Sequence, residues 1–470
     1  MVGPDFYGPP IPNTKSYTKK PIPKKTASTK DAGKAGARQN FAHNADIPLD
    51  WWKLYKSKEL NFLIEEGLKN SPTLDKARAT LIEAQENLTA TWTGLLLPAS
   101  ELDLAYERTR FSTQQFGLPA VNLFNLYNTQ VNVSYTLDVL GGSRRQIEST
   151  KAYTEFQAYE FLAAQLTLTS NIVTTAVTSA SLREQITVTK SLIKDSKKQL
   201  SLIKKQLVLG GVSKENVLAQ ETQLAQTIAT LPPLEKSLAN SDHALAVLIG
   251  CSPGDAKLPK IKLSDLTLPK KLPVSIPSQL LKQRPDVKAA EALLHQASAE
   301  IGVATANLLP TFPIVGGYGY LSDQLNTLFT SFGNVWAYGF SAAQPLSNLV
   351  PYAAKRRAAI AAYDASLAQY RETVIEAFKN VADSLRAIEY DAEKLKAETT
   401  ATNAAYETLK LNRSQFKLGA IDYINLLSSE QQYQKTVINK IQAQAARYND
   451  TAALFQALGG GWWNCGRRCE

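Results

Sequence analysis

Three histidines and one glycine-rich corner are the residues whose types could do chemistry in this chain. His43, His243 and His295 have no carboxylate or cysteine at metal-ligand spacing, so each is expected to be an ordinary surface or packed residue. Gly141-Gly142-Ser143 precedes a helical pattern but lacks the lysine of a phosphate-binding loop, which favours a strand-to-helix corner. No Gly-x-Ser-x-Gly motif occurs. The sequence therefore predicts no catalytic, cofactor or metal site, and no enzyme.

A compact charged triplet, Arg284-Pro285-Asp286, could contact a partner or could simply begin a helix. Proline suits the first helical turn, and an aspartate there lies near the positive end of the helix dipole, which favours the structural role. The cysteines indicate no chemistry. Cys251 stands alone, and for Cys465 and Cys469 a local disulfide, free thiols and a cloning remnant all stay open.

The positive charge is concentrated near the start of the chain. Of the formal net charge of +10, residues 1–40 carry +6 and the rest of the chain only +4. A nearly neutral body argues against a nucleic-acid partner. The leader, residues 1–50, is rich in Pro, Lys, Ser and Gly, so it is expected to be extended, either as a solvated tail or as a strap along the body.

Two motifs recur about 210 residues apart. Residues 70–79 (NSPTLDKARA) align with 283–292 (QRPDVKAAEA), and residues 206–212 (QLVLGGV) align with 415–421 (QFKLGAI). The protein is therefore predicted to contain two copies of one structural repeat.

Each repeat contains a long helical pattern. From Ile360 to Phe416 an apolar residue returns at every seventh position except Thr402, which is the seam of a coiled coil. At 1.5 Å per residue, the stretch 352–417 is roughly 100 Å long, and 143–208 is its counterpart. Two shorter helices, one before the strands and one returning after a Gly-containing turn, together match this length. The pattern predicts the wall of a helical cylinder.

Between the opening helix and the long helix, each repeat alternates apolar and polar residues and is rich in aromatic residues. This period of two predicts two strands in each repeat and four in the chain. Four strands cannot close a barrel, so they either form a soluble sheet that caps a helical rod or face lipid in a barrel pooled from several copies. Three copies would give twelve strands. The lipid-facing candidates are Leu102, Leu104, Tyr106, Val131, Val133, Tyr135, Tyr318, Tyr320, Trp336, Tyr338 and Phe340.

The predicted protein is mainly α-helical with a small transmembrane β portion. It begins with the leader, 1–50, and ends with the tail, 464–470. Repeat 1 covers 51–270, with helix 72–97, strands about 100–140, long helix 143–208, return helix 213–250 and linker 251–270. Repeat 2 covers 271–463, with helix 285–309, strands about 311–347, long helix 352–417 and return helix 422–458. Pro232 and Pro233 should bend the first return helix.

Several motifs in combination point to one family. They are Gln283-Arg284-Pro285-Asp286-Val287, Ala290-Glu291, Ala297, Ile301-Gly302-Val303-Ala304 and Leu309-Pro310, with Val2-Gly3-Pro4-Asp5-Phe6, Trp51-Trp52 and Ala457-Leu458-Gly459-Gly460-Gly461-Trp462. Together they resemble the TolC-like outer-membrane efflux channels, or outer membrane factors, and in particular their OprM/NodT lipoprotein branch. The resemblance spans about residues 2–463.

The resemblance implies a homotrimer in the outer membrane of a Gram-negative bacterium. Its twelve-stranded β-barrel would be surrounded by outer-membrane lipid and continued by a twelve-helix α-barrel in the periplasm. Such a trimer is the exit duct of a tripartite efflux pump or a type I export system. It conducts substrate passively, and an inner-membrane transporter supplies the energy and delivers substrate through a periplasmic adaptor.

The resemblance also assigns residues at the periplasmic end. The adaptor-docking tips would be Leu209-Gly210-Gly211 and Leu418-Gly419-Ala420, and the gate residues would be Ile424, Asn425, Ser428 and Asp422. The apolar constriction of the family falls on Ile424, whereas its acidic ring positions fall on Asn425 and Ser428. Because those acids are missing here, a cation-sensitive gate is not supported. An apolar constriction at Ile424 is still expected.

The lipoprotein branch normally has a lipidated cysteine just before the residues that correspond to 1–5. The sequence is therefore expected either to begin just after such a cysteine or to have been made without it, and a lipid anchor is expected in the native protein, with any signal peptide already removed. The competing hypothesis is a soluble or peripheral coiled-coil scaffold. The aromatic strands count against a rod because they interrupt both repeats at the same place.

Overall fold

The computed structural model describes residues 1–10, 16–43, 45–112, 121–274, 277–344 and 346–464. Cys465 and Cys469 lie outside these ranges. The chain divides into two compact units. We call them the sheet unit (Met1–Pro9, Thr80–Ala158 and Ala289–Arg371) and the hairpin unit (Pro10–Ala79, Tyr159–Lys288 and Glu372–Glu470).

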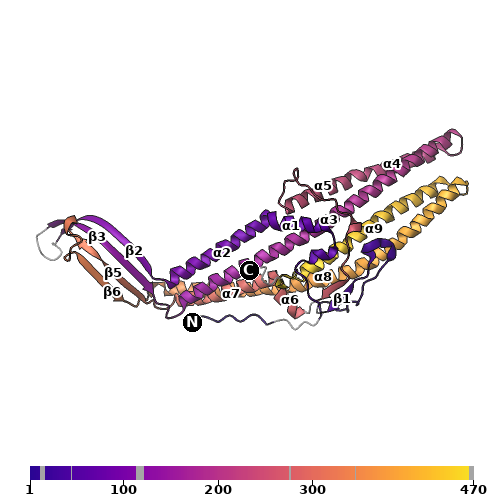
Figure 1. The fold of residues 1–470 in the computed structure, drawn as a ribbon. Coiled ribbons are helices and arrows are strands. Elements are labelled where there is room, and N and C mark those ends of the chain that lie inside the picture. Colours follow the sequence, from indigo (N-terminus) through magenta and orange to yellow (C-terminus); the bar gives the residue numbers. More distant parts are fainter. Residues whose placement is uncertain (11–15, 44, 113–120, 275–276, 345, 465–470) are drawn as a thin grey trace. The chain divides into compact units, whose positions relative to one another are not determined.

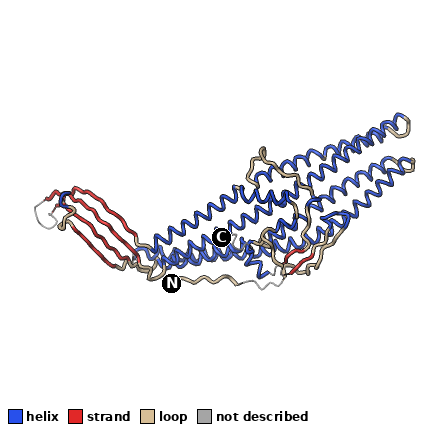
Figure 2. Tube along the Cα trace, in the orientation of Figure 1, coloured by secondary structure: helices blue, strands red, loops and turns tan. Residues whose placement is uncertain are grey.

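Helices make up most of the described chain, and the strands are few (Figures 1 and 2). The α-helices are α1 (Lys58–Asn70), α2 (Pro72–Leu96), α3 (Gly142–Val208), α4 (Lys214–Ala229), α5 (Leu231–Leu248), α6 (Pro277–Gln283), α7 (Pro285–Ala306), α8 (Leu349–Lys417) and α9 (Tyr423–Ala457). The strands are β1 (Asn40–His43), β2 (Ala99–Ser112), β3 (Val121–Thr136), β4 (Lys271–Val274), β5 (Pro313–Ser322) and β6 (Asn334–Phe340). None of the described helices is both long and apolar enough to cross a bilayer.

The two longest helices, α3 and α8, have 67 and 69 residues. After its first residue α3 contains no Gly or Pro, and α8 contains only Pro351, which lies in its first turn. Proline is tolerated there because the first N–H groups of a helix have no intrahelical acceptor. Each helix ends just before a glycine of positive φ, Gly210 at 75° and Gly419 at 71°.

The sequence predicts one return helix over 213–250 that is bent at Pro232 and Pro233; the interruption lies there, but it divides the helix in two. Two helices lie there, α4 ending at Ala229 and α5 beginning at Leu231. Pro232 and Pro233 have no N–H group, so the carbonyl oxygens four residues earlier lose their helical donors. The intervening residue Thr230 keeps helical dihedral angles, so the interruption is short.

A four-stranded antiparallel sheet forms one end of the sheet unit, with strand order β2-β3-β5-β6 (Figure 1). The helices join the strands at the end that contains Ala99, Thr136, Pro313 and Phe340. The opposite end contains Ser112, Val121, Ser322 and Asn334. The β2–β3 pair extends further than β5–β6, because its register continues from Ala99 to Ser112.

In the hairpin unit the described residues of the leader pack against the helices, as a strap does. It contains a 3-10 helix over Lys30–Gly36 and the strand β1, which pairs in parallel with β4. The buried Arg447 of α9 donates hydrogen bonds to the carbonyl oxygens of Ala35 (2.5 Å) and Ala37 (3.1 Å) and to the side chain of Gln39 (2.8 Å). Burial lowers the pKa of Arg447 to about 10. The helices α1 and α6 and the β1–β4 pair had no counterpart in the sequence prediction.

Candidate functional site: the sheet faces and the hairpin tips

All eleven lipid-facing candidates lie on one face of the four-stranded sheet. Directly opposed residues of an antiparallel pair share a face, and so do alternate residues along a strand. Leu102 opposes Val131, Val131 opposes Tyr318, and Tyr318 opposes Trp336, so one row of candidates crosses all four strands. The other seven follow in steps of two residues. We call this the apolar face.

The opposite face is the polar face. It carries all three acidic side chains of the sheet, Glu101, Asp103 and Glu107, which alternate with the apolar candidates along β2. On β3 it carries amide side chains, and Asn132 donates a hydrogen bond to the carboxylate of Asp103. One face thus suits hydrocarbon and the other suits water, which is the arrangement of a membrane barrel.

The apolar face is uncovered in a single copy of the chain. Nine of the eleven candidates are exposed, and Tyr135 and Tyr320 are half-buried. Aromatic rings pack along the surface, with Tyr106 and Tyr127 centroids 4.9 Å apart and Trp336 stacked on Tyr338 at 5.9 Å. An exposed apolar surface of this extent marks contact with a membrane or another protein.

The sheet also has two open edges. In the described chain β2 pairs only with β3, and β6 pairs only with β5, so each leaves one row of backbone N–H and C=O groups unpaired. Such edges readily pair with another strand and are not tolerated in hydrocarbon.

The two predicted docking tips lie in the hairpin unit and share one backbone design. Gly211 N–H donates to Gln206 O (2.8 Å), and Ala420 N–H donates to Gln415 O (2.9 Å), the six-residue bond of a Schellman cap. Leu209 and Leu418 are 84% and 83% exposed. Both tips therefore present an apolar side chain to solvent on a rigidly closed helix end.

The four predicted gate residues lie at the start of α9, and all are exposed. Asp422 is the N-cap residue, and Ile424, Asn425 and Ser428 occupy one helical face because they are spaced three and four residues apart. Ile424 is 60% exposed in a single copy. Glu430, the other nearby acid, is buried away from this face.

Behind the gate face lies a core that joins both helical hairpins. Its buried members come from four helices: Ile203, Val217, Leu409, Tyr423, Leu426 and Leu427. Tyr423 Oη donates a hydrogen bond to Gln220 Oε1, and Gln220 Nε2 donates to Ser196 Oγ (2.8 Å). The start of α9, which carries the predicted gate residues, is therefore positioned by residues of α3, α4 and α8 as well as its own helix.

An ion pair with one buried partner supports the same region. Arg413 of α8 lies 3.2 Å from Glu430 of α9. Burial raises the pKa of Glu430, and the positive charge of Arg413 partly opposes this shift. Neither this pair nor Tyr423 was among the residues predicted from the sequence. The available signal was the aligned pair Lys204 and Glu221 in the first predicted repeat, which is also 17 residues apart.

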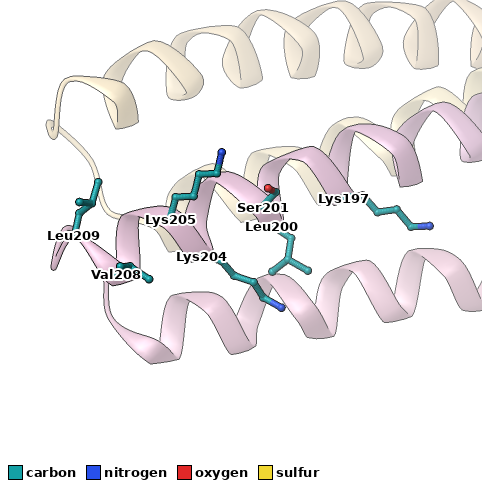
Figure 3. Close-up of a pocket in the computed structure, with 7 residues that line it drawn as sticks. All are labelled: Lys197, Leu200, Ser201, Lys204, Lys205, Val208 and Leu209. Carbon is teal, nitrogen blue, oxygen red and sulfur yellow. The ribbon is translucent and has the colours of Figure 1, made fainter.

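The first tip carries a basic surface groove. A cavity of about 750 Å³ runs along the last three turns of α3, and Figure 3 shows Lys204 and Lys205 extending from different sides of the helix near Leu209. Its lining residues are Lys197, Leu200, Ser201, Lys204, Lys205, Val208 and Leu209. The groove combines apolar contact area with positive charge.

The remaining chemical candidates have structural roles. The ring of His295 lies 2.9 Å from the carboxylate of Glu148 and stacks on Phe6, with ring centroids 4.5 Å apart. Glu148 is far from His295 in the sequence, so the residues around His295 did not indicate this contact. Arg284 pairs with Asp286 (2.5 Å) and donates to the carbonyl oxygen of Ala457 (2.9 Å), so the charged triplet ties α7 to the end of α9.

The glycine-rich corner is a helix start, because Asp138 accepts hydrogen bonds from the backbone N–H groups of Ser143 and Arg144, each at 3.0 Å. The described residues contain no group of three or more His, Cys, Asp or Glu side chains that could hold a metal ion.

Comparison with known proteins decides the family. The sequence model of the outer membrane efflux protein family matches residues 63–251 and 276–460. The chain belongs to the outer membrane efflux protein family. The two matched segments overlap the two predicted repeats, 51–270 and 271–463.

Individual members of the family resemble the chain over most of its length. It is 26% identical to the pyoverdine export outer membrane protein OpmQ of Pseudomonas putida over 417 residues, 88% of each chain. It is 26% identical to the toluene efflux pump outer membrane protein TtgF of Pseudomonas putida over 473 residues, 98% of this chain and 94% of TtgF. Among solved structures, the outer-membrane channel OprN matches with a TM-score of 0.88 and 25% identity, covering 98% of this chain and 99% of that one.

These likenesses establish what the protein does. It is an outer-membrane efflux channel of a Gram-negative bacterium, in a family whose members serve pumps and are channels rather than enzymes. The prediction of an efflux channel is confirmed, and the alternative of a soluble scaffold is not favoured.

Proposed function

We propose that three copies of the chain assemble into one passive duct. Their sheets form a twelve-stranded barrel in the outer membrane, and their helices continue it as a twelve-helix barrel in the periplasm. The observation that carries this proposal is the sheet itself, which has an apolar face, a polar face and two open edges. In a ring, β2 of one copy pairs with β6 of the next, so no backbone group is left unpaired in hydrocarbon.

The two different faces of the sheet support an assignment of the lipid side and the water side of the barrel. The apolar face meets lipid, and the polar face, with Glu101, Asp103 and Glu107, lines the lumen. A water-filled lumen of this kind discriminates weakly between solutes. The choice of substrate therefore belongs to the transporter that feeds the duct.

Cysteine cross-linking tests the ring. In a chain whose native cysteines are replaced by serine, Ala105→Cys in β2 is paired in turn with Val335→Cys, Ala337→Cys or Gly339→Cys in β6. At least one pair should give covalent trimers on a non-reducing gel. The matched control places the first cysteine at Asn128 in the central strand β3, where no other copy can reach it. Folded chains that stay monomeric in native mass spectrometry would contradict the proposal.

We also propose that the two tips bind a periplasmic adaptor, which links the duct to an inner-membrane transporter. Leu209 and Leu418 are exposed apolar side chains on closed turns, and such positions supply binding energy without refolding. The double variant Leu209→Asp and Leu418→Asp should abolish efflux in cells and keep the conductance of the purified channel. Retained efflux would remove the tips from the adaptor interface.

At the start of α9 we propose a periplasmic constriction formed by Ile424 from each copy, with Asn425, Ser428 and Asp422 around it. Adaptor binding shifts the population towards an outward packing of the helices. Ile424→Ser should raise the single-channel conductance in planar bilayers several-fold, because a small polar side chain wets the constriction. Leu218→Ser, an exposed leucine of α4, is the control. Unchanged conductance in Ile424→Ser would exclude the constriction.

A further inference from the structure

The acidic and basic residues of the sheet lie on opposite faces, and the basic residues lie nearer the end of the sheet that is farther from the helices. The strands β2, β3, β5 and β6 contain only five charged residues, all on β2. The acids Glu101, Asp103 and Glu107 lie on the polar face, whereas Arg108 and Arg110 lie on the apolar face, in step with Leu102, Leu104 and Tyr106. The two arginines are therefore the only charges that these described strands place on the face that meets lipid.

The arginines lie beyond the last row of the eleven lipid-facing candidates. Tyr106 opposes Tyr127, Arg108 opposes Asn125 in the next row, and Arg110 opposes Leu123 in the row after that. From the row of Tyr135 at the helix end to the row of Tyr127, β3 advances eight residues, which is about 27 Å along the strand and about 21 Å in height at a tilt near 40°. This nearly fills the apolar band of an outer-membrane barrel, so the arginines lie at the level of the outer headgroups.

No acidic side chain of the described strands shares this surface. Arg108 and Arg110 are exposed. The segment 113–120 that follows them contains no charged residue, and the only acid of the β5–β6 hairpin, Asp323, lies at the end of β5, two strands away from β2. A charged side chain on the lipid face costs free energy near the midplane and little at the interface. A positive pair at this height is stabilised by an anion of the headgroup layer.

We propose that Arg108 and Arg110 bind phosphate groups of lipid headgroups in the outer leaflet of the outer membrane. Side chains two residues apart on one strand face lie about 7 Å apart, and each guanidinium presents a fork of N–H donors that matches phosphate oxygens. The pair can therefore hold one phosphate between them or two phosphates of one headgroup. This inference rests on the proposed membrane position of the sheet.

Binding of lipid A, a glucosamine disaccharide lipid with two phosphates, tests the proposal. The full chain in detergent is titrated with lipid A, with dephosphorylated lipid A and with inorganic phosphate, and bound lipid is counted by native mass spectrometry. Wild type should prefer phosphorylated lipid A, and Arg108→Gln with Arg110→Gln should weaken its binding about tenfold or more. Arg108→Lys with Arg110→Lys keeps the charge but loses the fork, so its affinity should be intermediate.

The matched control removes two positive charges from the hairpin unit, Lys257→Gln with Lys396→Gln, and should bind lipid A as wild type does. Equal binding of the phosphorylated and dephosphorylated lipids by wild type, or unchanged affinity in the arginine-to-glutamine variant, would overturn the proposal. Inorganic phosphate that competes at the same concentration as lipid A would also overturn it, because the site would then be a free-anion site.

Conductance in planar bilayers separates this proposal from the proposed function. A variant that conducts as wild type does is folded and inserted, so its lipid binding is a fair measurement. If wild type forms no channel, the membrane position of the sheet is wrong, and the proposed function falls with it.

Discussion

The two hairpin tips use one backbone design and differ in what surrounds it. Both α3 and α8 end in the same Schellman cap, with a glycine of positive φ and a six-residue hydrogen bond of 2.8 or 2.9 Å. Even an ion pair is repeated, because Lys204 and Glu221 align with Arg413 and Glu430 at an offset of 209 residues. The pairs are 2.7 and 3.2 Å apart.

Burial is where the two hairpins differ. Lys204 and Glu221 are 54% and 40% exposed, whereas Glu430 is only 8% exposed beside a half-exposed Arg413. Glu430 is buried because α9 packs against α3 and α4 of the other hairpin, whose Ile203 and Val217 belong to the same core. The two hairpins thus share the cap and the ion pair, while asymmetric packing made the second hairpin the one whose surroundings are tightly fixed. The proposed gate lies on that hairpin.

The largest effect should come from the shared core. Leu426 and Val217 are aligned residues of the two hairpins and both are buried. Leu426→Ala should cost about 3 kcal/mol, and Val217→Ala about 2 kcal/mol, because fewer apolar atoms are removed. Because the core is shared, amide hydrogen exchange should accelerate at both tips in each variant. Acceleration confined to the mutated hairpin would show that the hairpins are independent.

A second prediction separates the aligned ion pairs. Arg413→Gln leaves Glu430 buried without a counter-charge and should lower the free energy of local opening by about 2 kcal/mol, since Arg413 itself is half-exposed. Lys204→Gln breaks an exposed pair and should cost less than about 1 kcal/mol. Hydrogen exchange of the segments around each residue measures both values. Equal losses of free energy in Arg413→Gln and Lys204→Gln would mean that the burial of Glu430 does not make its ion pair stronger than the exposed one.

How much of this could be predicted from the sequence depends on how local each signal is. Heptads without interior Gly or Pro indicate α3 and α8, and alternation with aromatic residues indicates the strands, because both signals lie within one element. The leader is different. Arg447 holds it through backbone carbonyl oxygens of Ala35 and Ala37, which carry no side-chain pattern and are about 410 residues away.

The sites divide in the same way. The tips could be located from the glycines that close two long helices, and the apolar face from alternate residues. The burial of Glu430 could not be predicted from the sequence, since it arises from packing of α9 against residues more than 200 positions earlier. The contact of His295 with Glu148 joins residues 147 positions apart, so their spacing carried no signal.

A third prediction tests the shared cap. Gly210 and Gly419 have positive φ, and the space that a β-carbon would occupy at each is open, so alanine would be strained by the backbone alone. Each of Gly210→Ala and Gly419→Ala should therefore cost about 1 kcal/mol, measured by hydrogen exchange in the last turn of α3 or α8. A clearly larger cost at Gly419 would show that the caps differ in more than their surroundings.

The smallest predicted effect is a pH trend at Glu430. Its pKa is raised in the folded protein by burial, so between its ordinary value and the raised one the folded state holds a proton that the unfolded state has lost. Stability then falls as pH rises through this window, by at most about 1.4 kcal/mol per pH unit. Glu430→Gln removes the titration, so its melting temperature relative to wild type should be higher at about pH 7.5 than at about pH 4.5.

Glu221→Gln is the matched control, because Glu221 forms the aligned but exposed ion pair and its removal should change the melting temperature little at either pH. If Glu430→Gln and Glu221→Gln respond to pH in the same way, burial of Glu430 has no energetic consequence. The contrast between the two hairpins would then lie in the apolar core alone, because the ion pairs would be equivalent in free energy as well as in sequence position.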